Sequence, residues 1–103
     1  MAGAQELPLE TITSLCSRWG ITELSVFGSA LRDDYTAQSD LDIMVDFAPG
    51  RTPGLEYYDL QIELEQLVGQ PVDLFIRVGV EHSRNTEFRD EVQRTARVIY
   101  AAD

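Results

Sequence analysis

The spacing of apolar and polar residues along the chain predicts alternating helices and strands. Between residues 8 and 19, apolar side chains recur three and four positions apart, which predicts an amphipathic helix that ends before Gly20. Four short apolar runs have the length and composition of strands. These runs cover residues 21–27, 41–47, 72–76 and 97–101.

Helical patterns and a loop fill the rest of the chain. Two prolines and two glycines within residues 48–54 predict a loop. A helix is expected over 55–68, because Gly69 and Pro71 end the apolar stripe there, and a last helix over 83–95. The order of elements predicts an α/β (α+β) fold, with a small mixed sheet of about four strands flanked by helices.

The predicted strand over 41–47 has one apolar face and one face with carboxylates. Successive side chains of a strand point to opposite sides of the sheet. The apolar positions are Leu41, Ile43, Val45 and Phe47, whereas Asp42, Met44 and Asp46 share the other face. We therefore expect the apolar face to pack against helices and the other face to present acidic groups.

Length and charge narrow the classes of function. The 103 residues fit one domain, which we take as residues 1–103. All eight basic residues are arginine, and eighteen acidic residues give a net charge of −10. This charge argues against direct nucleic-acid binding, and the missing lysine excludes a Walker-type phosphate loop. An anionic substrate must then be held by a metal ion, backbone amides or arginine.

The composition also indicates a cellular compartment. Cys16 is the single cysteine, which rules out an internal disulfide framework and fits a reducing cytoplasm. No apolar run approaches the length of a membrane span, and the first residues lack the pattern of a secretion signal. We expect a cytoplasmic protein that does not associate with a membrane.

One segment carries a pattern of residues suited to phosphate chemistry. Gly28 and Ser29 end the first predicted strand, Asp40 and Asp42 open the second after ten intervening residues, and Asp73 lies in the third. Asp40 and Asp42 point the same way in an extended chain, with Cα atoms roughly 7 Å apart. Mg²⁺ prefers such oxygen ligands, and two divalent ions can hold the attacking and leaving oxygens of a nucleotidyl transfer.

The glycine turn suits a phosphate group. Gly28 lacks the Cβ that would keep a phosphate from the backbone, and Ser29 offers a hydroxyl and an amide. A helical turn after Ser29 would direct free amides at the same anion, and Arg32 is close enough in sequence to help bind a triphosphate. Each part alone has an ordinary explanation as a turn or a solvated surface. Their combination, in this order and on these elements, favours a functional site.

This arrangement resembles the signature of the polymerase-beta-like nucleotidyltransferase superfamily. The resemblance covers nearly the whole chain, and the lack of an appended domain makes it similar to the minimal nucleotidyltransferases. These are the MntA-like antitoxins of HEPN/MNT toxin–antitoxin pairs. The resemblance implies that Gly28 and Ser29 bind the triphosphate. It also implies that Asp40, Asp42 and Asp73 are catalytic and hold two Mg²⁺ ions. We further expect one of these carboxylates, Asp73, to help deprotonate the attacking hydroxyl.

The resemblance further implies transfer of AMP from ATP to a tyrosine of a cognate HEPN ribonuclease toxin, with which the chain could form an oligomer. An acidic surface suits a basic protein partner of this kind better than a nucleic-acid acceptor. Two alternatives remain open at this stage. The chain could neutralise its partner by occlusion without catalysis, or it could modify a small molecule such as an aminoglycoside.

Overall fold

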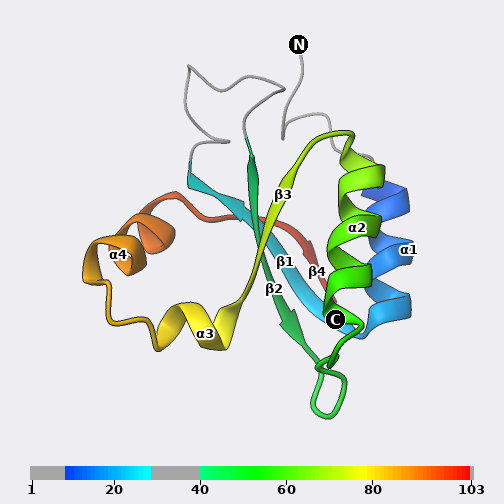
Figure 1. Ribbon diagram of the computed structural model, residues 1–103, viewed down its shortest axis with the longest axis horizontal. Helices are drawn as coiled ribbons and strands as arrows, with labels where there is room; N and C mark the ends of the chain where they lie inside the picture. The colour runs from blue at the N-terminus through cyan, green and yellow to red at the C-terminus, as the bar shows by residue number, and fades with distance from the viewer. Residues whose placement is uncertain (1–8, 29–39, 103) are drawn as a thin grey trace.

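The computed structural model describes residues 9–28 and 40–102, which form one mixed sheet with helices on both faces (Figure 1). The strands are β1 (Ile21–Phe27), β2 (Leu41–Phe47), β3 (Val72–Ile76) and β4 (Arg97–Ala101). The helices are α1 (Leu9–Trp19), α2 (Tyr57–Val68), α3 (Arg77–Glu81) and α4 (Thr86–Thr95). The strand order is β3-β2-β1-β4, with β1 antiparallel to β2 and β4, and β2 parallel to β3.

The two faces of the sheet pack against different helices. Helices α1 and α2 lie together on one side of the sheet, and α3 and α4 lie on the other (Figure 1). The larger core cluster joins α1 and α2 to the apolar face of β2, at Leu41, Ile43 and Val45. A smaller cluster lies on the α3–α4 face and includes Phe27 and Met44. Within residues 9–28 and 40–102, no helix is long and apolar enough to cross a membrane.

The predicted elements agree with the structure except in two helices. All four predicted strands have the bounds expected from the sequence. The α2 helix begins at Tyr57, two residues later than predicted. The last helix, predicted over 83–95, is α4 and begins three residues later, at Thr86, and the short helix α3 was not predicted. The later start is explained by Asn85, whose extended backbone precedes α4 and whose side chain accepts a 3.1 Å hydrogen bond from the Phe88 amide.

Side chains of α2 bind the free edge of β3. Because β3 is the last strand of the sheet, its outer backbone groups have no strand partner. The Tyr57 hydroxyl donates to the carbonyl of Leu74, and the Gln61 amide donates to the carbonyl of Val72 at 3.0 Å. The Val72 amide donates to Glu65 at 3.0 Å. These contacts hold β3, and with it Asp73, beside β2.

Candidate active site

Asp42 and Asp73 are neighbours on adjacent strands. The parallel register of β2 and β3 places Asp42 directly opposite Asp73. On its other side, Asp42 is opposite Phe27 of β1. Asp42 alternates with the core residues Leu41 and Ile43, so its side chain lies on the α3–α4 face. The strand pairing therefore brings together two of the three carboxylates that the sequence singled out.

Asp40 interacts with Asp73. Asp40 is exposed and immediately precedes β2, so its backbone lies close to the end of the sheet where β3 begins, one residue before Asp73. The pKa of Asp73 is raised above its ordinary value, chiefly by desolvation, and further by the charge of Asp40, a hydrogen bond with Asp40 and the charge of Glu65. A proton or a cation between these carboxylates would relieve their repulsion.

Gly28 leaves the space that the Asp42 side chain occupies. Gly28 follows β1 with a φ of +72°, a conformation that favours glycine. A Cβ on Gly28 would lie 2.6 Å from Oδ2 of Asp42, closer than any real contact. The Gly28 amide donates a 3.0 Å hydrogen bond to Oγ1 of Thr95. A side chain at position 28 would therefore move the Asp42 carboxylate from its present place, a reason for glycine that the sequence did not reveal.

A further carboxylate, Glu91 of α4, lies beside the same turn. Its Oε2 is 3.8 Å from the position that a Cβ on Gly28 would take, the same position that Asp42 approaches. Thr95 links α4 to this place, because its hydroxyl accepts from Gly28 and donates to the carbonyl of Glu91 at 2.7 Å. Sequence reasoning missed Glu91 and Thr95. No motif connects them to Gly28, and only the packing of α4 brings them there.

Two predicted site residues, Ser29 and Arg32, lie outside the described residues, and their roles stay predictions. Within residues 9–28 and 40–102, no three His, Cys, Asp or Glu side chains are gathered as a metal site. Asp40 instead contacts Asp73, and the Asp42 carboxylate lies against the Gly28 turn. Repulsion between like charges opposes closer grouping, and binding of a divalent cation relieves it.

Comparisons of sequence and of structure both find nucleotidyltransferases that are similar to this chain. Protein adenylyltransferase MntA of Thermococcus cleftensis is 38% identical over 84 residues, which cover 73% of this chain and 83% of that protein. A solved structure assigned as a minimal nucleotidyltransferase is 37% identical, covers 86% of each chain and has a TM-score of 0.66.

A third likeness concerns the fold alone. A structure of the tri-AMPylated Shewanella oneidensis HEPN toxin in complex with MNT antitoxin matches at 21% identity and a TM-score of 0.63, over 95% of this chain and 73% of that one.

The profile of the nucleotidyltransferase domain family matches residues 10–99, which span every described element except the ends of α1 and β4. This match confirms the resemblance seen in the sequence, and the chain belongs to the nucleotidyltransferase domain family.

Proposed function

We propose that this chain acts in the cytoplasm as a single-domain, Mg²⁺-dependent protein adenylyltransferase, an antitoxin that transfers AMP from ATP to a tyrosine hydroxyl of a HEPN ribonuclease toxin. The observation that carries the proposal is the pairing of Asp42 with Asp73 on adjacent strands, beside the Gly28 turn and next to Asp40. Paired aspartates beside a glycine turn on a nucleotidyltransferase fold suit transfer from a triphosphate.

The residues present fit magnesium. Asp40, Asp42 and Asp73 offer the oxygen donors that Mg²⁺ prefers, and Gly28 has no side chain to crowd the carboxylate of Asp42. Two bound Mg²⁺ ions would neutralise the phosphates and stabilise the charge that develops during transfer. Asp40, Asp42 and Asp73 are proposed to hold these ions on the α3–α4 face of the sheet.

The chain's own residues would bind the triphosphate and remove a proton. Gly28, Ser29 and Arg32 are proposed to hold the phosphates. In the reaction, the tyrosine oxygen forms a bond to the α-phosphorus of ATP, the bond from that phosphorus to its bridging oxygen breaks, and pyrophosphate leaves. Asp73 is proposed to accept the tyrosine proton, because a carboxylate beside the acceptor can act as a general base.

The relatives support the choice of acceptor. The relative from Thermococcus cleftensis bears the name of a protein adenylyltransferase, and a structure with this fold contains an AMPylated HEPN toxin with its MNT antitoxin. The net charge of −10 suits a basic protein acceptor. We propose a HEPN toxin as the partner, in a complex of the two chains.

Incubation with α-labelled ATP, Mg²⁺ and the protein encoded beside this chain tests the proposal. We expect label on a tyrosine of that protein and loss of ribonuclease activity. Asp42→Asn and Asp73→Asn should abolish labelling. Asp46→Asn is a matched control, because Asp46 lies on the same strand but faces Arg77 at 3.7 Å. It should retain labelling.

The alternatives predict different results. Full neutralisation of the toxin by Asp42→Asn without any label would favour occlusion over catalysis. Label on an aminoglycoside but not on the protein would favour a small-molecule acceptor. Equal labelling by wild type and Asp42→Asn would contradict the proposed site.

A further inference from the structure

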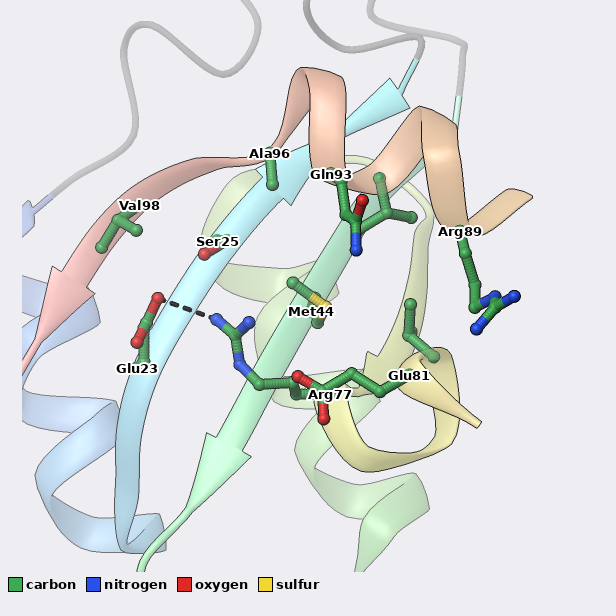
Figure 2. A pocket seen from close by; sticks show the side chains of 11 residues that line it. Glu23, Ser25, Met44, Arg77, Glu81, Arg89, Gln93, Ala96 and Val98 are labelled. Atoms are coloured by element: carbon green, nitrogen blue, oxygen red, sulfur yellow. Dashed lines mark hydrogen bonds and ion pairs between the residues drawn. The ribbon is translucent and has the colours of Figure 1, made fainter. Parts of the chain in front are cut away.

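A pocket of about 350 Å³ lies on the sheet beneath α4, apart from the aspartates (Figure 2). Apolar side chains form much of its wall, and they come from β2, β4, α3 and α4. They include Met44, Val80, Val92 and Val98. The volume is at the small end for a ligand site, with room for one ring system. None of the residues that the sequence singled out for catalysis lines this pocket.

Two polar atoms of the pocket lining are buried without a partner. The side chain of Ser25 is on the β1 floor of the pocket and is 1% exposed. Its hydroxyl oxygen and Nε of Arg89 are the only buried side-chain nitrogen or oxygen atoms without a hydrogen-bond partner in the part of the chain that the structure describes. Both residues line this pocket. An unpaired buried polar group is costly, so a ligand with a hydrogen-bond acceptor would gain from meeting them.

The charges around the pocket are balanced. Arg77 donates a 2.8 Å hydrogen bond to Glu23, and Figure 2 shows this pair at one side of the opening. Glu81 and Arg89 add one charge of each sign. An anionic ligand would meet two carboxylates, and a cationic ligand would meet two guanidinium groups. The lining therefore favours an uncharged ligand.

We propose that this pocket binds an uncharged aromatic ring that carries a hydroxyl group. The ring would contact Met44 and the valines, since a methionine sulfur interacts well with an aromatic edge. Because these two atoms have almost no accessible surface, neighbouring side chains must shift before the hydroxyl accepts from Nε of Arg89 or exchanges a hydrogen bond with Ser25. This binding goes beyond the proposed transfer of AMP and does not depend on it.

The pocket is separated from the Gly28 turn by aromatic side chains. Phe27 follows Ser25 on the same face of β1 and is 2% exposed. Its ring packs against Phe75 and Phe88, with centroid distances of 5.4 and 5.9 Å. A ligand in the pocket would thus be distinguishable from a nucleotide or an acceptor at the aspartates.

Titration with p-cresol, followed by ¹H–¹³C NMR of the methyl groups, tests the proposal on the whole chain. We expect saturable shifts centred on Met44, Val80, Val92 and Val98. Toluene lacks the hydroxyl, and 4-methylbenzoate carries a negative charge, so both should bind more weakly. Equal binding of p-cresol and toluene, or shifts confined to residues outside the pocket, would overturn the proposal.

Variants separate the hydroxyl contact from general affinity. Ser25→Ala should weaken p-cresol binding roughly three- to tenfold, the effect of one hydrogen bond, and leave toluene binding unchanged. Ser17→Ala, on the exposed side of α1, is the matched control and should bind like wild type. If Ser25→Ala does not fold, Val98→Trp serves, because Val98 lines the pocket and tolerates a larger side chain that would take up part of its volume. Unchanged p-cresol binding in Val98→Trp would contradict the proposal.

Two further measurements complete the test. N-acetyltyrosinamide carries the same ring on a polypeptide backbone. Binding as tight as that of p-cresol would show that the pocket admits a tyrosine within a polypeptide, whereas its exclusion would restrict the ligand to a free phenol. Asp42→Asn should bind p-cresol normally even though AMP transfer is lost, so the two proposals can fail separately. Loss of p-cresol binding in Asp42→Asn would show that the ring occupies the aspartate site instead.

Discussion

Gly28 shows how one residue can satisfy two constraints at the same place. Its positive φ turns the chain at the end of β1, and its missing side chain leaves room for the Asp42 carboxylate. Its amide is held by Thr95 of α4. The turn therefore joins β1, β2 and α4 at the point where the carboxylates of Asp42 and Glu91 approach it.

We expect Gly28→Ala to be more damaging than the same change at Gly50. Both glycines have a positive φ, but a Cβ on Gly50 would meet nothing within 4 Å. Gly50→Ala should cost about 1–2 kcal/mol from backbone strain alone. Gly28→Ala should lose about 0.5–1.5 kcal/mol more, because its Cβ forces the end of the Asp42 side chain to rotate away. Urea unfolding measures both variants, and equal losses would show that the Asp42 contact is not rigid.

At the scale of elements, helix α2 acts as a neighbour for the edge strand β3. Tyr57, Gln61 and Glu65 occupy successive turns of one face of α2 and bind backbone groups at the outer edge of β3. This arrangement substitutes side-chain hydrogen bonds for those of a further strand. It keeps β3 in register with β2, on which the pairing of Asp42 with Asp73 depends.

Tyr57→Phe tests this role of α2. The variant removes the hydroxyl that donates to Leu74 and leaves that carbonyl without this partner. We expect a loss of about 0.5–1.5 kcal/mol in the free energy of unfolding. Tyr58→Phe changes the adjacent side chain, which is 66% exposed, and should have no measurable effect. If the two variants unfold alike in thermal denaturation, the contact does not stabilise β3.

The contact between α1 and α2 predicts a pH dependence of stability. The pKa of Glu63 is lowered from 4.5, first by the hydrogen bond from Arg18 and then by that from Trp19. A carboxylate with a lowered pKa in the folded state stabilises the fold above its unfolded pKa, and this contribution is lost as the pH falls through the folded pKa. Stability should therefore fall below pH 4.5 partly through Glu63.

Glu63→Gln measures how much of this loss of stability at low pH comes from Glu63. The variant should be less stable than wild type near pH 6 and should approach it as the pH falls below 4.5, because glutamine does not titrate. Glu10→Gln, an exposed change on α1, is the control. Chemical unfolding from pH 3 to 7 records the difference. A constant gap between Glu63→Gln and wild type across this range would exclude a contribution from ionised Glu63.

At the scale of the whole molecule, the two faces of the sheet have different roles. One face is closed by α1 and α2 around the larger core, and the other carries the aspartates and the pocket under α4.

The net charge of −10 is spread over only 103 residues. Self-repulsion of this charge opposes the folded state, and salt screens it.

We therefore expect stability to rise with ionic strength. An increase in NaCl from about 10 mM to about 150 mM shortens the screening length and should raise the melting temperature. KCl at the same concentrations should give the same rise, because the effect depends on charge and not on a specific ion. Differential scanning calorimetry provides the measurement, and a fall in melting temperature with both salts would contradict this account.

The sequence by itself determined the local elements and the residues with suitable chemistry. The bounds of all four strands follow from apolar spacing, a property of neighbouring residues, and the glycine turn and aspartates follow from their order along the chain. It did not predict α3, whose five residues are too few to show a helical period, and it started α4 three residues before the cap at Asn85 allows.

Only the tertiary structure decided which side chains meet. The register that sets Asp42 beside Asp73, the position of Glu91 near Gly28 and the unpaired Ser25 under α4 all depend on contacts between distant segments. Periodicity cannot encode such contacts, because it reports which way a side chain points on its own element and not what lies opposite.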